Sequence, residues 1–381
     1  MRKPVYLVLF LSLFIYCGPK HKKVEKIMEN GVEVVLNHVE PYKIKGEPNT
    51  LTLEEELIID TERDEIAKLG LVDIDAFTLN SEGNIYILCR KSKESHIFKF
   101  DKNGNFILFF GLSGQGPGEL QAPLYIGIDN KEDVVVTDSR KRKLIIFDNE
   151  GNFKKEIPFE KSIIFVHPLE NGNYLIFYQV FDLPGSDYFS QSPLSLWSSE
   201  FEELKELGRL KLLDYSKQRK RKGTVPIFCW SVSRGHVYFG NEESRYEIRV
   251  YDLEGNLFRK IRKEYKKEPI PDEYKKERMK NRRPQDREIT YFPDSFPPYQ
   301  GFFADETRRL FVMTYEKSNY PSGYIYDIFN SKGVFIGRKS INGFKTRGGH
   351  MWVITRQNYL YGIKEKESGY KELVVYKMRW E

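Results

Sequence analysis

The acidic and histidine side chains of this sequence offer little metal or acid–base chemistry. Asp73 and Asp75 alternate with apolar neighbours, so a strand there would direct two carboxylates to one side. Paired carboxylates suit a calcium or lactonase-type centre, but the other segments expected to run beside this one add no acidic residues. The histidines are scattered without metal-ligand spacing: His96, His167, His236 and His350. We therefore expect no metal, no cofactor and no catalytic residue set.

A glycine-rich run from Gly111 to Gly118 could be read as a phosphate-binding loop. A P-loop needs Gly-Lys followed by Ser or Thr at the start of a helix. Here Gly118 is followed by Glu119 and a predicted strand. We interpret the run as a tight loop between two structural units.

Basic side chains are concentrated in three stretches, residues 140–143, 217–222 and 259–288. The last stretch has thirteen Lys and Arg against seven Asp and Glu. An electropositive surface would steer an acidic protein, or an anionic or carbohydrate ligand, from solution. The alternative is that all three stretches are solvated loops. The candidate binding residues in them are Arg140, Arg142, Arg219 and Arg221.

The N-terminus has the pattern of an export signal. Arg2 and Lys3 precede an apolar run from Val5 to Tyr16, which is too short to span a bilayer comfortably. Cys17 ends the run where it resembles the lipobox cysteine of bacterial lipoproteins, which implies a lipid anchor in a membrane; positions 14 and 16 depart from that motif. The alternatives are an uncleaved anchor and a signal cut slightly later. Each alternative places the globular part outside the cytoplasm, in the cell envelope, which disfavours nucleic acid as a partner.

Repeated strand hairpins must position these residues. A strand ending in an acidic or polar residue precedes a turn, where Asp or Asn bonds the following backbone and Gly takes a positive φ. Six copies, two of them without the glycine, end at positions 101, 148, 198, 252, 330 and 377. Their spacing is 47 to 54 residues except for one gap of 78, close to the length of a four-stranded propeller blade.

The repeat therefore predicts an all-β fold, a six-bladed β-propeller of four-stranded antiparallel blades. We assign residues 1–17 to the signal peptide, 18–50 to a polar linker and 51–381 to the propeller. The long gap predicts an insertion at 263–299, between blades four and five. The last unit has room for three strands, so Leu51–Asp60 is expected to supply the fourth and close the ring; the alternative is an N-terminal helix.

One segment resembles a known family. The run from Gly111 to Leu120, followed by Pro123 and by Ile126 to Asp129, is similar to the blade junction of NHL-type six-bladed propellers, particularly envelope lipoproteins. The resemblance covers residues 71–157 best and 225–261 less well. It implies the fold and no activity, because propellers carry many unrelated functions.

The resemblance also implies that the connections between blades and the loops joining second to third strands share one face. The basic stretches and the insertion would then lie together on one rim. Within the insertion, residues 272–281 predict a short helix. The aromatic segment 291–299 is expected to pack either over the pore mouth or against this helix.

Aromatic side chains on the first strands are expected to line the central channel, where they would stack on a ligand or fill the core. The candidate binding residues are Tyr125, Trp230 and Phe302, together with Tyr299 from the insertion. Phe228 and Trp352 are also aromatic residues on first strands. Cys89 and Cys229 fall in blades one and four, too far apart to bond, so both should be free and buried.

These features favour an envelope-anchored binding or scaffold protein that uses its basic face over an enzyme. The alternative is a propeller hydrolase or lyase acting at the channel mouth. An enzyme should gather several acidic, histidine or amide side chains there, whereas a binding protein should present aromatic and basic ones.

Overall fold

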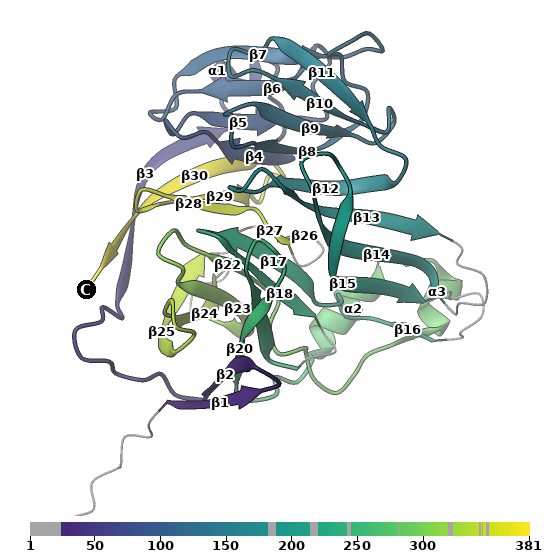
Figure 1. The fold of residues 1–381 in the computed structure, drawn as a ribbon. Coiled ribbons are helices and arrows are strands. Elements are labelled where there is room, and N and C mark those ends of the chain that lie inside the picture. Colours follow the sequence, from purple (N-terminus) through teal and green to yellow (C-terminus); the bar gives the residue numbers. More distant parts are fainter. Residues whose placement is uncertain are drawn as a thin grey trace, which may run out of the picture.

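Six four-stranded antiparallel sheets are arranged in a ring in the computed structural model (Figure 1). The structure describes residues 24–181, 188–213, 220–241, 245–280, 282–318, 323–342, 344, 346–347 and 350–381. The predicted fold class is confirmed. Blade one comprises β4 (Ala76–Leu79), β5 (Ile85–Leu88), β6 (Ser95–Phe100) and β7 (Phe106–Leu112). Blade two comprises β8 (Pro123–Ile128), β9 (Val134–Asp138), β10 (Lys143–Phe147) and β11 (Phe153–Pro158).

The remaining blades follow the same order along the chain. Blade three comprises β12 (Ser162–Pro168), β13 (Tyr174–Phe181), β14 (Tyr188–Trp197) and β15 (Glu203–Leu213). Blade four comprises β17 (Phe228–Ser233), β18 (His236–Asn241), β19 (Glu247–Tyr251) and β20 (Leu257–Lys263). Blade five comprises β22 (Gly301–Ala304), β23 (Leu310–Lys317), β24 (Gly323–Phe329) and β25 (Phe335–Asn342). Blade six comprises β28 (Val353–Arg356), β29 (Tyr359–Glu365), β30 (Lys371–Trp380) and β3 (Leu51–Asp60).

The repeated turns have the chemistry that the sequence predicts. Asp101 Oδ1 accepts hydrogen bonds from the backbone N–H groups of Asn103 and Asn105, both at 2.8 Å, and Gly104 has a φ of 84°. The turns at positions 148, 252 and 330 repeat the pattern. The sixth copy differs, because position 377 lies inside β30 and no turn follows it. The fourth strand of blade six comes from the other end of the chain, so this blade needs no such turn.

The predicted closing strand is confirmed. Strand β3 pairs antiparallel with β30 over nearly its whole length, from Leu51 opposite Trp380 to Asp60 opposite Glu372. Leu51 and Ile59 are buried, and each fully buried aliphatic side chain contributes about 1.5–3 kcal/mol. The N- and C-terminal parts of the propeller are thus held in one sheet.

Part of the expected polar linker is folded. Strands β1 (Glu25–Glu29) and β2 (Val32–Asn37) form a hairpin, and β2 adds in parallel to β20 at the outer edge of blade four (Figure 1). Val34 and Val35 are fully buried there. The assignment of 18–50 to a linker is therefore incorrect for residues 25–37, because burial of this apolar run outweighs the polar character of the residues around it.

The chain between β2 and β3 then crosses blade five. The Tyr42 N–H donates to the Phe335 carbonyl at 2.8 Å, and the Asn330 side chain donates to Glu47 at 2.7 Å. The Asn49 N–H donates to the Glu381 carbonyl at 3.0 Å. We call residues 24–50 the N-terminal strap, because they fasten blades four, five and six together from outside.

The two faces of the ring are defined by the direction of the strands. Since neighbouring strands are antiparallel, the connections between blades and the second-to-third-strand loops leave one face, named here the loop face. The first-to-second and third-to-fourth turns leave the other, named the turn face. The outer strand ends at 112, 158, 213 and 263 therefore all open onto the loop face.

Candidate functional site

Two basic segments that are distant in sequence meet on the loop face. Strand β16 (Arg221–Lys222) pairs in parallel with β21 (Thr290–Tyr291). The Arg221 N–H donates to the Ile289 carbonyl at 2.6 Å, and the Gly223 N–H donates to the Tyr291 carbonyl at 2.7 Å. The connection between blades three and four is thereby attached to the insertion between blades four and five. We call β16, α2 (Asp272–Lys280), α3 (Pro284–Glu288) and β21 together the basic lid.

The predicted helix of the insertion is confirmed as α2, and α3 follows it. Tyr274 on α2 contacts Phe292 and Phe296 edge to face, with ring centroids 6.4 and 4.9 Å apart. Phe296 in turn stacks on Tyr315 of blade five, with centroids 4.1 Å apart. Of the two expectations for the aromatic segment, these contacts match packing against the helix. Aromatic contacts therefore attach the lid to blade five of the propeller.

The charge of the basic stretch is divided between the lid and the blade. Four of its thirteen cationic residues lie on β20, where Arg259 pairs with Glu33 at 2.5 Å and Arg262 with Glu29 at 2.5 Å. Both acidic partners belong to the N-terminal strap. Lys276 and Lys280 on α2 are exposed instead. Residues 220–222 and 272–288 together carry ten Lys and Arg against five Asp and Glu, so the lid keeps the excess positive charge.

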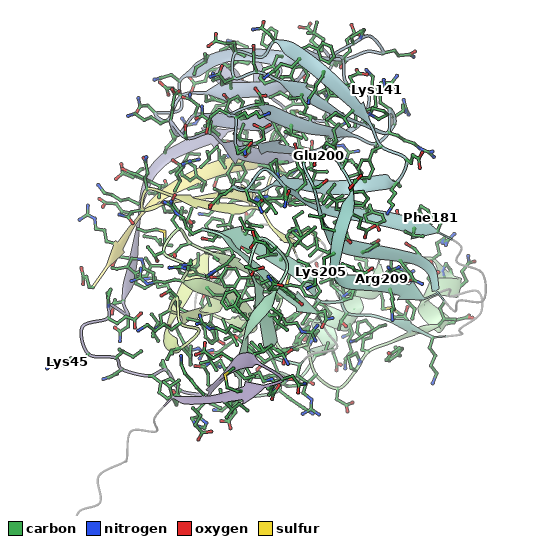
Figure 2. The ribbon with its side chains drawn as sticks, viewed as in Figure 1. Lys45, Lys141, Phe181, Glu200, Lys205 and Arg209 are labelled. Atoms are coloured by element: carbon green, nitrogen blue, oxygen red, sulfur yellow. The ribbon has the colours of Figure 1, made fainter. Side chains whose placement is uncertain are left out.

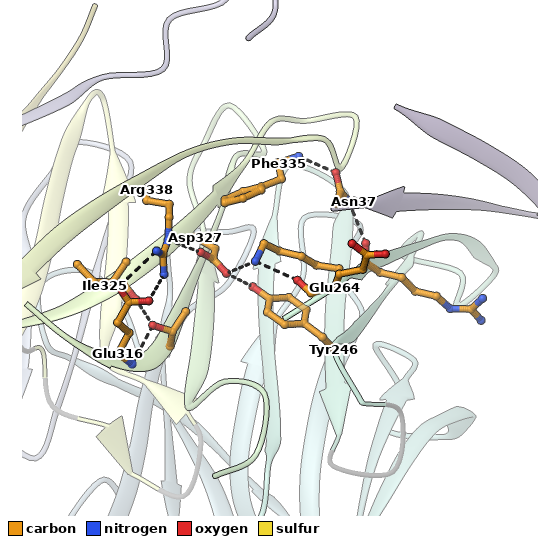
Figure 3. Close-up of polar contacts among 11 residues, drawn as sticks. Asn37, Tyr246, Glu264, Glu316, Ile325, Asp327, Phe335 and Arg338 are labelled. Atoms are coloured by element: carbon orange, nitrogen blue, oxygen red, sulfur yellow. Dashed lines mark hydrogen bonds and ion pairs between the residues drawn. The ribbon is translucent and has the colours of Figure 1, made fainter. Parts of the chain in front are cut away.

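An ion network with a buried centre lies between blades four and five (Figure 3). Asp327 accepts a hydrogen bond from the Tyr246 hydroxyl at 2.8 Å and pairs with Lys263 at 3.3 Å and Arg338 at 3.1 Å. Arg338 also pairs with Glu316 at 2.5 Å. Burial lowers the pKa of Lys263 and raises that of Tyr246. The charges are matched within the network, which therefore joins two blades.

Arg140 and Arg142 lie on another part of the loop face, in the loop between β9 and β10 of blade two. Both are exposed. The loop is ordered by Asp138, which accepts the N–H groups of Arg140 and Lys141. Lys141, labelled in Figure 2, turns inward and donates to the Gly116 carbonyl at 2.8 Å. These two arginines form a separate basic spot on a different blade from the lid.

The central cavity opens on the turn face. It has a volume of about 330 Å³, and most of its lining comes from the second halves of the six first strands. The mouth is formed by side chains from the first-to-second turns, including Glu170, Arg234, Glu306 and Arg356. At β28 the lining also includes the start of the strand, because Trp352 and Val353 belong to the lining. The cavity is therefore on the opposite side of the ring from the basic lid.

Trp352 lines the part of the cavity that is nearer the loop face. It packs against hydrophobic clusters that belong to several blades around the ring, and its ring centroid lies 6.2 Å from that of Tyr125. Strand β27 (His350–Met351), immediately before it, contacts β17 and β22 of blades four and five. Trp352 therefore lies where the chain enters blade six and forms an aromatic part of the cavity lining.

The structure divides the predicted binding set between the two faces. Tyr125 and Trp230 line the central cavity, and Phe302 contributes to its wall although its side chain is almost fully buried. Tyr299 is fully buried between blades four and five, where its hydroxyl donates to the Glu247 carbonyl, so its assignment to a binding surface is incorrect. Phe228 is likewise a core residue between blades three and four. Cys17 and Arg219 lie outside the described residues.

Asp73 and Asp75 do not face each other in an open site. Asp73 is buried and pairs with Lys371 at 2.6 Å and Lys91 at 2.7 Å, while Asp75 accepts the Arg90 N–H at 2.8 Å. Within the described part of the chain, no group of three or more His, Cys, Asp or Glu is placed to hold a metal ion. The two carboxylates therefore stabilise the entrance to blade one.

Both late cysteines are free and buried, as the blade positions predicted. Burial raises the pKa of the Cys89 and Cys229 thiols. In the ranges that the structure covers, no helix is long and apolar enough to cross a membrane.

Sequence reasoning missed the side chains at the mouth of the cavity. Glu306 lies 3.5 Å from Arg234 and also accepts the Gln357 N–H, so three consecutive blades are linked around the opening. Inside, the Tyr125 hydroxyl lies 3.1 Å from His167 Nδ1. A sequence signal for these turns was present. Asp129 and Asp305 each accept a hydrogen bond from the backbone N–H four residues later, as the aspartates of the recognised third-to-fourth-strand turns do.

Comparison with known proteins identifies the fold and a family. The profile of a family described as 6-bladed beta-propeller, DUF5128, matches residues 71–283. A solved structure from Bacteroides fragilis, described as an exported protein, is similar over 91% of this chain and 99% of its own, with 12% identity and a TM-score of 0.51. A DUF4221 protein from Bacteroides vulgatus is similar over 88% of this chain and 100% of its own, with 11% identity and a TM-score of 0.52. No curated protein matches the sequence. The matched profile spans more than half of a chain that closes into six blades, so the chain belongs to the six-bladed β-propeller family DUF5128.

Proposed function

We propose that the protein is a binding protein of the cell envelope that captures an acidic partner protein with its basic lid. The observation that carries the proposal is the pairing of β16 with β21, which joins two basic segments at one place on the loop face. Clustered cations raise the local potential and the rate of encounter with an acidic surface. Exposed side chains such as Lys276 and Lys280 are available for direct ion pairs.

The proposed location is the outer side of a bacterial membrane, with a lipid on Cys17 as the anchor. The basic and apolar pattern of the first seventeen residues supports export. The similar Bacteroides fragilis protein is described as exported, which agrees with this placement. An envelope location separates the lid from nucleic acid and leaves acidic proteins and anionic glycans as the partners that its charge suits.

The binding role is favoured over a hydrolase or lyase by the chemistry of the two faces. An active site would bring several acid, base or amide groups together with room for substrate between them. At the cavity mouth, Arg234 and Glu306 already pair with each other. The lid presents cations on short helices that are attached by aromatic packing, an arrangement that suits recognition.

The lid is tested by removing three of its exposed charges, in the variant Lys276→Gln, Lys280→Gln and Arg283→Gln. The matched control removes the same charge from the turn face, with Lys102→Gln, Lys131→Gln and Lys332→Gln, all of which are exposed. The probe is poly-L-glutamate, which mimics an acidic protein, titrated at low and high salt. Because each exposed charge pair contributes about 0.2–1 kcal/mol, the loss of three pairs should weaken binding by roughly 3- to 150-fold.

The comparison of the two variants decides the outcome. The control variant should keep the affinity of the wild-type protein, and added salt should abolish most of the difference. Equal weakening of both variants would mean that net charge alone attracts the probe, and the lid would lose its role.

The anchor is tested separately by the mass of the mature N-terminus. A lipid on Cys17 should add a diacylglyceryl mass and direct the protein to the detergent phase, and Cys17→Ser should remove both. An unmodified N-terminus in the wild-type protein would contradict the anchor and leave the lid proposal untouched.

A further inference from the structure

The central cavity is a second candidate binding site, independent of the basic lid. It opens on the turn face, and Trp352 lines its inner part and packs against the hydrophobic core. Its volume of about 330 Å³ is at the lower end of the range of about 300–1,000 Å³ that is typical of small-molecule sites. An extended peptide would need an open groove, so the size of the pocket restricts the ligand to a small compact molecule.

The floor and walls present aromatic rings to this space. Tyr125 and Trp352 both line it, and Phe165 lies between Tyr125 and Trp230 with ring centroids 3.9 and 5.0 Å away. Rings packed in this way have little freedom left to lose when a ligand stacks on them. Flat aromatic surfaces suit ligands with an apolar face.

The polar groups of the cavity carry balanced charge. Arg234 and Arg356 stand with Glu306 and Glu170 around the mouth. His167 lies on the wall beside Tyr125, and burial lowers its pKa to about 4, so it is neutral near pH 7. The lining therefore has two cations, two anions and a neutral imidazole, and it favours neither an anionic nor a cationic ligand.

Donors and acceptors alternate around the mouth while the floor is aromatic. Guanidinium groups donate and carboxylates accept, and both make stronger hydrogen bonds than neutral groups do. A pyranose ring has hydroxyls around its edge and an apolar face of C–H groups, so it matches a polar collar above an aromatic floor. We propose that the cavity binds a neutral carbohydrate of one or two sugar rings.

Intrinsic fluorescence provides the test, because two of the four tryptophans, Trp230 and Trp352, line the cavity. The full-length protein is titrated with glucose, galactose, N-acetylglucosamine, maltose and cellobiose, and with sodium glucuronate as the charged comparison. At least one neutral sugar should change the emission saturably, with a dissociation constant on the order of 1 mM. Glucuronate should bind no more tightly than glucose.

Variants locate the site. Glu306→Gln keeps the size of the side chain but removes the charge paired with Arg234, and it should weaken sugar binding roughly tenfold, the effect of losing one charged hydrogen bond. Trp230→Phe should reduce the amplitude of the emission change. Trp197→Phe, in the core of blade three, should keep the amplitude, and Lys276→Gln on the loop face should keep the affinity. Thermal melting of each variant verifies that it is folded.

Three results would overturn the proposal. The first is the absence of a saturable change with every neutral sugar in the wild-type protein. The second is a tenfold preference for glucuronate, which would show an anion site. The third is equal weakening by Glu306→Gln and Lys276→Gln, which would place the binding outside the cavity. Loss of poly-L-glutamate binding has no bearing on any of these outcomes, so this proposal and that for the lid can fail separately.

Discussion

Replacement of Asn37 by alanine should destabilise the protein strongly, although this residue lies in a segment whose composition suggests a linker. Its side chain is 3% exposed. It donates to the Arg262 carbonyl at 3.1 Å and to the Gly333 carbonyl at 3.0 Å, and it accepts the Phe335 N–H at 2.8 Å. One amide group thus connects the N-terminal strap to blades four and five.

The cost follows from these three bonds. Each contributes about 0.5–1.5 kcal/mol, and the Phe335 N–H would remain buried without a partner, which adds about 1–3 kcal/mol. We expect Asn37→Ala to lower the free energy of unfolding by about 3–4 kcal/mol. Unfolding in urea, followed by tryptophan emission and far-UV circular dichroism, measures the shift in midpoint.

A matched control uses the same substitution at an exposed turn. Asn256→Ala removes a side-chain hydrogen bond of 2.9 Å to Asp252 at the surface of blade four, and it should cost less than about 1 kcal/mol. If the two variants unfolded at the same urea concentration, the strap would not be held through Asn37. The reasoning that residues 24–50 belong to the folded unit would then be refuted.

Three other substitutions or reagents probe the interior. Burial lowers the pKa of His167 to about 4. The neutral side chain therefore makes its full contribution to the free energy of unfolding above pH 6.5, and this contribution is lost as the pH falls toward 4. Between pH 7 and 4.5, the free energy of unfolding in urea should fall by about 2 kcal/mol less in His167→Gln than in the wild-type protein. Cys89 and Cys229 should not react with Ellman's reagent in the native protein and should both react in urea, since burial raises the pKa of each thiol; rapid native labelling would contradict their burial. Asp327→Asn should cost about 3 kcal/mol because it leaves the buried Lys263 without its carboxylate partner, whereas Asp272→Asn on the exposed helix should cost less than about 1 kcal/mol.

The blade order was predictable because its signals are local. A turn such as Asp101 to Asn105 requires particular residues at particular positions, and the spacing between turns follows from the length of a blade. The closing strand was predictable for a related reason, since residues 51–60 have a strand pattern with no neighbour in the sequence. The last repeat unit had only three strands, so it needed a fourth, and residues 51–60 were a strand that needed a neighbour.

The strap was missed because its partner is distant. Residues 32–37 form a short apolar run that pairs in parallel with β20, more than two hundred residues later. A local pattern can predict a strand of this kind but cannot name its partner. The lysines and glutamates around the run suggested a solvated spacer, whereas Glu29 and Glu33 in fact neutralise arginines of blade four.

The structure separates the candidate binding residues, which the sequence had placed together on one face. Tyr125 and Trp230 were assigned to the inner strands correctly, but their pocket opens away from the basic loops. Each first strand runs from one face of the ring to the other. The position of a residue along the strand therefore decides whether its side chain lies near the loop face or near the turn face. Arg234 and Arg356 lie at the turns where these strands end, which is why they share a mouth with the aromatic rings.

Strand β3 has a consequence for biogenesis. The sixth blade combines residues 51–60 with residues 353–380, so this sheet cannot form until the ribosome has made almost the entire chain. Until then β3 has no partner strand, although blades one to five are each built from consecutive strands, and the ring stays open whether the chain emerges into the cell or from a secretion pore. Final assembly is therefore a single late docking event between the two ends of the polypeptide, and nascent chains truncated before position 371 should stay sensitive to protease.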